Sequence, residues 1–97
     1  MKLVLHRRVR SDVEEIMDYY EGAGHPELAQ DFYRELRGFM LDTALRPDRY
    51  HFFKADLRQV NLKRFPYHFL FRVVGDCVRI LVVRHHRRHP DYGLERE

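Results

Sequence analysis

The feature that most constrains the fold of this chain is a pair of strand-like segments joined by only two residues. Residues 67–74 and 77–84 are rich in β-branched and aromatic side chains, which pack well on a pleated sheet. Gly75 and Asp76 lie between them, and glycine in the first position of a two-residue loop suits a type II′ turn. We therefore predict an antiparallel hairpin whose two strands pair at the centre of a sheet.

Two helices are expected before this hairpin, because apolar side chains recur there at helical spacing with acidic residues on the opposite face. Ser11 and Glu14 have the spacing of a capping box, so we expect the first helix to begin at Ser11 and to stop at Gly22-Ala23-Gly24. Pro26 suits the first turn of the second helix, and Pro47 ends it, since the residue before a proline avoids helical geometry.

The remaining segments complete a small α+β domain. We expect a short first strand at residues 3–5, a short extended piece at 50–53 and a strand over 57–65. This order predicts an N-terminal strand and a two-helix antiparallel hairpin packed on a mainly antiparallel twisted sheet of about four strands. In the strand over 67–74, the alternate side chains expected to face the helices are Tyr67, Phe69, Phe71 and Val73. A chain of 97 residues is the size of a single domain, here residues 1–97.

Charge is divided unevenly along the chain. Residues 11–45 hold nine acidic residues and two arginines, whereas residues 58–97 hold nine Lys or Arg, four acidic residues and four of the seven histidines. A basic half on a small domain favours a polyanion as partner, with nucleic acid as the first candidate. An ordinary solvated strand face is the alternative. Because the arginines gather beside histidines and aromatic residues, we favour the polyanion.

Three features predict a cytoplasmic protein without membrane contact. No apolar run approaches the roughly 20 residues that cross a bilayer. The first residues have too short an apolar stretch for a signal peptide. The single cysteine, Cys77, excludes an internal disulfide and fits a reducing compartment.

The order of elements and two motifs resemble the RelE/ParE superfamily, the small toxins of bacterial type II toxin–antitoxin modules. The motifs are Arg64-Phe65-Pro66-Tyr67 at the start of the hairpin and His85-x-Arg87-Arg88-x-Pro90-x-Tyr92 in the tail that follows it. The resemblance covers nearly the whole chain. One departure is Gly93, which stands where many relatives have a tryptophan.

The resemblance implies two candidate activities. Some members of the superfamily cut mRNA in the ribosomal decoding site, and others poison DNA gyrase and lack the nuclease residues. We expect the first, a ribosome-dependent, metal-independent mRNA endoribonuclease that inhibits translation. The alternative is a ParE-like toxin that binds and inhibits DNA gyrase without nuclease activity, and a weakened toxin that mainly holds its antitoxin is a third possibility. The expected partners are a cognate antitoxin, bound through apolar side chains set among bases, and mRNA on the ribosome, or DNA gyrase in the alternative.

The basic half contains the groups that such a cleavage needs. Attack by the ribose 2′-OH requires proton carriers and cations around the phosphate. Histidine carries protons near neutral pH, arginine matches phosphate bidentately, and tyrosine can stack on a base or donate a proton. The resemblance implies as catalytic residues His85, Arg87, Arg88 and Tyr92. The predicted RNA-binding residues are Arg58, Lys63, Arg64, His68 and Arg84.

Other interpretations of these residues stay open. Arg87 or Arg88 could pair with the acidic helices, and Tyr92 could pack under the sheet. Neighbouring residues of an extended chain point to opposite faces, so at most one of His85 and His86 faces a given site. A zinc site is conceivable from His85, His86, His89 and Asp91, although the sequence has no spaced Cys or His pair elsewhere to complete it. We expect neither a metal nor a cofactor.

Overall fold

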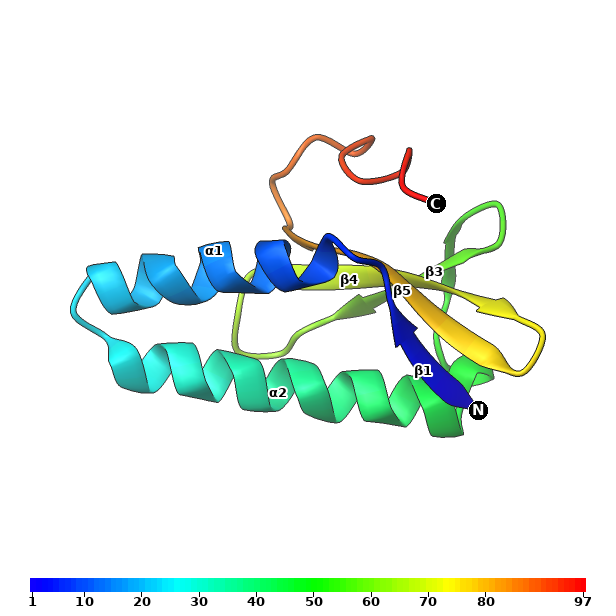
Figure 1. Ribbon diagram of the computed structural model, residues 1–97, viewed down its shortest axis with the longest axis horizontal. Helices are drawn as coiled ribbons and strands as arrows, with labels where there is room; N and C mark the ends of the chain where they lie inside the picture. Colours follow the sequence, from blue (N-terminus) through cyan, green and yellow to red (C-terminus); the bar gives the residue numbers. More distant parts are fainter.

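The computed structural model describes residues 1–97 and contains one sheet with both helices on the same face (Figure 1). Its elements, in chain order, are β1 Lys2–Leu5, α1 Val9–Gly22, α2 Pro26–Leu45, the 3₁₀ turn η1 Pro47–Arg49, β2 Phe52–Lys54, β3 Leu57–Asn61, β4 Tyr67–Val74 and β5 Cys77–His85. The five strands lie in the order β1-β5-β4-β3-β2. This is the predicted α+β fold, in which two helices cover one face of a mainly antiparallel sheet.

The predicted hairpin is confirmed and lies at the centre of the sheet. Strands β4 and β5 pair antiparallel, with Val74 opposite Cys77 at the two-residue loop. Gly75 has a φ of +59°, the left-handed conformation that the predicted turn requires of its first residue. The register shifts once, so that Leu70 pairs with Val82 and Phe71 with Ile80. The extra residue in β5 forms a bulge, which bends and twists a strand.

The sheet has one strand more than predicted, and its first pairing is parallel. Strand β1 lies beside β5, with Leu5 opposite Ile80. The fifth strand is β2, a three-residue edge strand paired with β3. Strand β3 ends at Asn61 and not at residue 65, because the Glu35 carboxylate accepts the backbone N–H groups of Lys63 and Arg64. These amides are therefore satisfied by a helix side chain and not by a neighbouring strand.

The predicted start of the first helix is wrong. Helix α1 begins at Val9, and its N-cap Arg8 makes no side-chain capping bond. The chain turns directly out of β1, and the Val9 N–H donates to the His6 carbonyl, so helical hydrogen bonding begins before Ser11. Ser11 and Glu14 thus lie inside the helix and form no capping box. Helix α2 ends at Leu45, as the proline at position 47 predicts.

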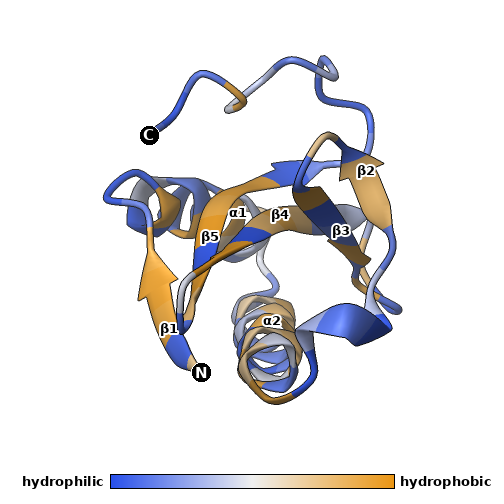
Figure 2. Ribbon diagram, turned by 90° about the vertical axis from the view of Figure 1, so that its right-hand side faces the viewer, coloured by the Kyte–Doolittle hydropathy of each residue, from blue (hydrophilic) through white to orange (hydrophobic).

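Apolar clusters lie on both faces of the sheet. Figure 2 shows the hydrophobic residues of β4 and β5 in orange at the centre of the sheet. The larger cluster lies between the helices and the sheet and includes the predicted Tyr67, Phe69 and Phe71, whereas Val73 is 39% exposed beyond it. The smaller cluster, on the opposite face, consists of Leu57, Leu70, Leu81 and Val82. Residues 86–97, called the C-terminal tail below, cross this second face (Figure 1). Neither helix has the length and apolar character that spanning a bilayer requires.

The C-terminal tail approaches the sheet closely at one glycine. Gly93 has a φ of +85°, and a Cβ atom added there would lie 2.6 Å from Cγ2 of Val82. Both the backbone conformation and the contact therefore require glycine. Tyr92 and Leu94, on either side of it, pack against the smaller cluster. A bulky side chain at position 93 would separate the tail from the sheet.

Candidate functional site

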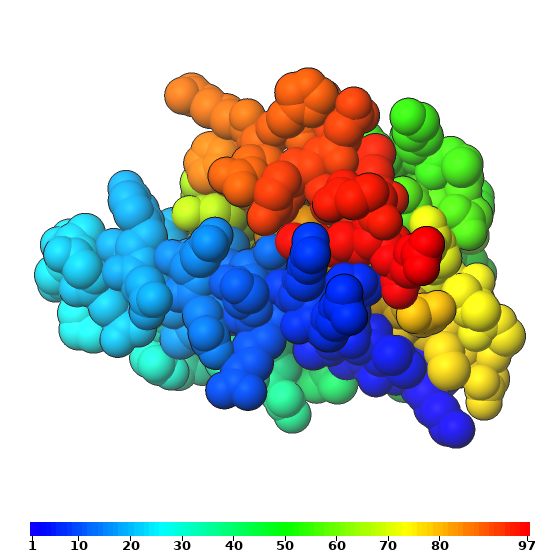
Figure 3. Space-filling view, turned by 45° about the horizontal axis from the view of Figure 1, so that its top comes forward, coloured from blue at the N-terminus to red at the C-terminus, as the bar shows by residue number.

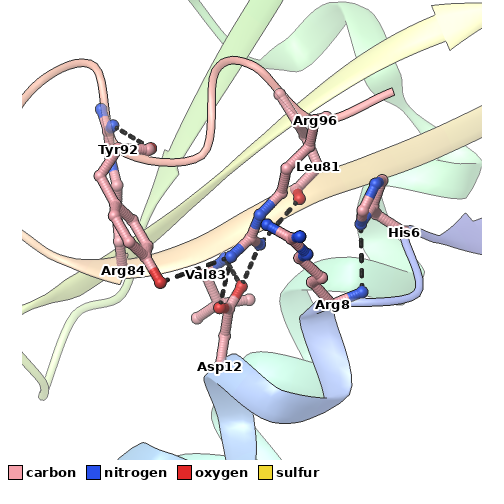
Figure 4. Close-up of polar contacts among 8 residues, drawn as sticks. All are labelled: His6, Arg8, Asp12, Leu81, Val83, Arg84, Tyr92 and Arg96. Atoms are coloured by element: carbon pink, nitrogen blue, oxygen red, sulfur yellow. Dashed lines mark hydrogen bonds and ion pairs between the residues drawn. The ribbon is translucent and has the colours of Figure 1, made fainter.

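A buried ion pair fastens the C-terminal tail to the first turn of α1 (Figure 4). Arg96 Nη1 and Nη2 donate to the two oxygens of Asp12 at 2.6 and 2.9 Å, and the two residues are 8% and 5% exposed. Asp12 Oδ2 also accepts the backbone N–H of Val83 at 3.0 Å. Strand β1 ends at Leu5, so the Asp12 carboxylate takes the place that a longer β1 would have beside β5. Its hydrogen bonds also raise the pKa of Arg96.

A second buried arginine holds the middle of the tail. Arg84 is 4% exposed, and its Nη1 donates to the carbonyl oxygens of Pro90 and Tyr92 at 2.7 and 2.8 Å. Its Nε donates to Nε2 of His68 at 2.9 Å. The structure therefore places Arg84, which was predicted to bind RNA, in the interior. Its guanidinium donates hydrogen bonds to carbonyl groups of its own chain. Such a cation has few donors left for a phosphate.

The hydrogen bonds of Arg84 also determine the state of His68. An arginine only donates, so Nε2 of His68 accepts and Nδ1 carries the proton. Nδ1 of His68 lies 2.9 Å from Nδ1 of His86, which is then the acceptor. Burial, reinforced by the charge of Arg84, lowers the pKa of His68 to about 4. At neutral pH His68 is uncharged and links Arg84 to His86.

Three of the four predicted catalytic residues line one pocket of about 230 Å³ between the tail and α1. They are His85, Arg88 and Tyr92, and the α1 side of the pocket carries Asp12 and Glu15. Arg88 Cζ lies 3.9 Å from the centre of the Tyr92 ring, a cation–π distance. The structure thus brings an imidazole, a guanidinium and a phenol together beside two acidic residues.

Arg87, the fourth predicted catalytic residue, does not line this pocket. Its backbone N–H donates to Nδ1 of His85 at 3.0 Å, which leaves Nε2 as the His85 nitrogen available for proton transfer. Neither Arg87 nor Arg88 forms an ion pair with the acidic helices. Tyr92 contributes both to the pocket and to the smaller apolar cluster, so the two interpretations of this residue are compatible.

The other predicted RNA-binding residues lie away from this pocket. Arg58 Nη1 donates to the Tyr50 carbonyl at 2.7 Å, and its guanidinium stacks on the ring of Phe52 at the β2 edge. Lys63 and Arg64 belong to the loop between β3 and β4, and Arg64 lies 3.6 Å from Asp31 of α2. The nine predicted residues therefore do not form one continuous surface.

Sequence reasoning missed Asp12 and Arg96. One signal was present, because Asp12 lies three residues after Val9 and four before Ile16, on the buried face of α1. A single carboxylate on an apolar helix face requires a partner. The sequence gives no comparable signal for Arg96, which lies among exposed charged residues.

The state of His68 predicts a pH dependence of stability. The unfolded pKa of histidine is about 6.5 and the folded value is about 4, so between these values the unfolded chain binds a proton that the folded chain does not. The free energy of unfolding should therefore fall as the pH falls through this window, by at most about 1.4 kcal/mol per pH unit. In urea unfolding at several pH values, His68→Gln should lessen the dependence of the free energy of unfolding on pH. His51→Gln, at an exposed position, is the control. Equal slopes for the parent and His68→Gln would contradict the assignment.

Comparison with known proteins agrees with the fold and gives the family. Residues 3–90 match the family model described as the ParE toxin of the type II toxin–antitoxin system, parDE. A solved structure described as the chromosomal ParDE toxin–antitoxin system from P. aeruginosa is similar, with a TM-score of 0.78, 23% sequence identity and coverage of 88% of this chain and 95% of that chain. No curated protein shows significant sequence similarity. Because the family model spans nearly the whole chain, the chain belongs to the ParE toxin family of type II toxin–antitoxin systems.

Proposed function

We propose that this toxin acts in the cytoplasm by binding and inhibiting DNA gyrase, without cutting RNA. The observation that carries the proposal is the match of residues 3–90 to the ParE family. Within the superfamily, ParE-like members are the ones that poison gyrase. This function differs from our first expectation from the sequence, which was an endoribonuclease.

The geometry of the basic residues supports a toxin that acts by binding. Metal-free RNA cleavage needs cations that are free to contact the phosphate. Arg84 is buried and bound to tail carbonyl groups, and His68 is uncharged at neutral pH. The pocket that holds His85 has a volume of about 230 Å³, below the roughly 300 Å³ at which small-molecule sites begin. Glu15 at its wall also repels a phosphate.

A ribosome-dependent mRNA endoribonuclease is the second candidate, and one observation favours it. His85, Arg88 and Tyr92 line the same pocket, so a proton carrier, a cation and an aromatic ring occur together. In that function His85 would carry the proton through Nε2, Arg88 would contact the phosphate and Tyr92 would stack on a base. The acidic wall would have to be neutralised by the ribosome.

The two candidates predict opposite effects of removing the proton carriers. For a gyrase inhibitor, His85→Ala and Tyr92→Phe should leave toxicity near that of the parent, because neither proton carrier is used. For a nuclease, loss of His85 should reduce cleavage by about 10²–10⁴-fold. The measurement is plasmid supercoiling by purified gyrase, together with mapping of transcript ends in cells that express each variant. New transcript ends that disappear in His85→Ala would contradict the gyrase proposal.

We also propose the place at which the cognate antitoxin binds. A groove of about 450 Å³ lies between β1, α1 and α2. Its apolar lining includes Leu3, Val13, Met17, Met40 and Leu41, and Arg10 and Arg37 lie at its edge. Such a groove suits the apolar face of an amphipathic segment. An acidic side chain of that segment could pair with Arg37, whereas Arg10 is already paired with Glu14, which also lines the groove. From the sequence we expected the antitoxin to bind on the basic C-terminal half, and the groove lies elsewhere. It still has the predicted pattern of apolar side chains beside basic residues.

Two leucines one helical turn apart test this groove. Leu41 lines it and is 46% exposed, whereas Leu45 is 75% exposed and lies outside it. Leu41→Lys should weaken binding of the protein encoded beside the toxin gene by tenfold or more, because it places a charge in the apolar contact. Leu45→Lys should bind like the parent, and isothermal titration calorimetry compares the two. Equal binding by both variants would show that the antitoxin binds elsewhere.

A further inference from the structure

A second pocket, at the start of α1, is lined almost entirely by charged side chains. It has a volume of about 470 Å³ and is formed by the turn between β1 and α1, by Arg79 of β5 and by the end of the tail. Leu5 is its only apolar lining residue. We call it the α1 basic pocket, and it is separate from the pocket that holds His85. Figure 3 shows the red end of the tail against the blue residues of this turn.

Three arginines of the α1 basic pocket have no acidic partner. Arg7, Arg8 and Arg79 form no ion pair, although several other surface arginines of the chain do, such as Arg10 with Glu14. The fourth arginine of the lining, Arg96, is neutralised by Asp12. The three remaining arginines outnumber Glu95 and Glu97 of the lining, so the pocket holds a small excess of positive charge.

The fold brings these charges together from distant parts of the sequence. Parallel pairing of β1 with β5 puts Leu5 opposite Ile80, which carries Arg79 to the turn that contains Arg7 and Arg8. The positive end of the α1 dipole lies at the same place. Three like charges repel one another, so this arrangement costs folding free energy that an anionic ligand would recover.

The pKa of His6, which lines the same pocket, is lowered from its usual value. Its pKa is lowered first by burial and then by the charges of Arg96, Arg7, Arg8 and Arg79. These four cations all act on one imidazole in the pocket. His6 also accepts the backbone N–H of Arg8, which holds the turn in shape (Figure 4).

The chemistry of the lining favours phosphate over a protein side chain. A protein partner needs an apolar centre to its contact, and this pocket offers only Leu5. Contacts to a nucleic-acid backbone need cations and few apolar groups, and the arginine fork matches the phosphate oxygens bidentately. We propose that Arg7, Arg8 and Arg79 bind phosphate groups of a duplex DNA backbone and so hold the toxin against the DNA of the gyrase complex. The choice of DNA rests on the proposed function.

The tail contributes two acidic residues to the same pocket. Glu95 and Glu97 line it, and neither side chain forms an ion pair with its arginines. Arg79 Nη2 donates to the backbone oxygen of Glu97 at 3.4 Å. The charges of Glu95 and Glu97 lie close enough to weaken the attraction of the pocket for an anion. The sign of their effect on DNA binding is therefore opposite to that of the arginines.

The salt dependence of DNA binding tests the proposal directly. Each phosphate contact contributes about 0.9 to the slope of log K against log salt concentration, so Arg7→Ala/Arg8→Ala/Arg79→Ala should reduce the slope by about 2.7. A control that removes the same charge elsewhere, Arg34→Ala/Arg46→Ala/Lys54→Ala, should change it by less than about 1. Glu95→Gln/Glu97→Gln should bind more tightly than the parent. Fluorescence anisotropy of a labelled short duplex measures all four proteins, and circular dichroism confirms their folding.

The outcomes separate this site from the proposed function. A triple arginine variant that loses no more slope than its control would overturn the site, even if the parent inhibits gyrase. The triple variant could show the expected reduction in salt slope while the parent fails to inhibit gyrase. That result would overturn the proposed function and keep the phosphate site. Tighter binding of an RNA of the same length, lost in the same triple variant, would replace DNA by RNA as the ligand.

Discussion

The buried ion pair between Asp12 and Arg96 determines how the two ends of this chain come together. Two charges taken out of water cost several kcal/mol each, and only close pairing with further hydrogen bonds offsets this cost. Asp12 accepts from both guanidinium Nη atoms and from the Val83 amide, and Arg96 Nη1 also donates to the Leu81 carbonyl. Of the polar side-chain atoms of this pair, only Nε of Arg96 is buried without a hydrogen-bond partner. The first turn of α1, the centre of β5 and the end of the tail are thus joined through one carboxylate.

This anchoring explains why two arginines of the basic C-terminal half stabilise the fold and do not bind a partner. Arg84 binds carbonyl groups of the tail, and Arg96 in the tail pairs with Asp12 of α1. Gly93 allows the tail to reach the sheet, because any side chain at this position would collide with Val82. The arginines left for a partner include exposed ones of the tail, Arg87 and Arg88, and the three unpaired arginines of the α1 basic pocket.

The parts of the fold that depend on local signals could be predicted from the sequence. The hairpin follows from a glycine turn between two strands, and α2 from its apolar stripe and flanking prolines. The parallel pairing of β1 with β5 could not be predicted, because it joins residues more than 70 positions apart and no local pattern specifies the strand beside which β1 lies. The early start of α1 was missed because the turn out of β1, and not a side-chain cap, satisfies its first amide.

The candidate site shows the same division. His85, Arg88 and Tyr92 come together because they are close in sequence and follow one strand. Arg58 and Arg64 were grouped with them by charge, but pairing of β3 with β4 carries them to other edges of the sheet. Charge composition predicts a basic surface, but burial decides which cations remain exposed on it. Arg84 is buried by the C-terminal tail, and no local sequence pattern predicts the path of that tail.

A double-mutant cycle on the buried pair tests the central claim that Asp12 and Arg96 act as one unit. Urea unfolding would compare the parent with Asp12→Asn, Arg96→Met and the double variant. We predict that each single change lowers the free energy of unfolding by about 3 kcal/mol or more, because each leaves a buried charge unpaired. The double variant should lose far less than the sum of the two. Losses that add within about 0.5 kcal/mol would show that the two residues act independently, and would contradict the account.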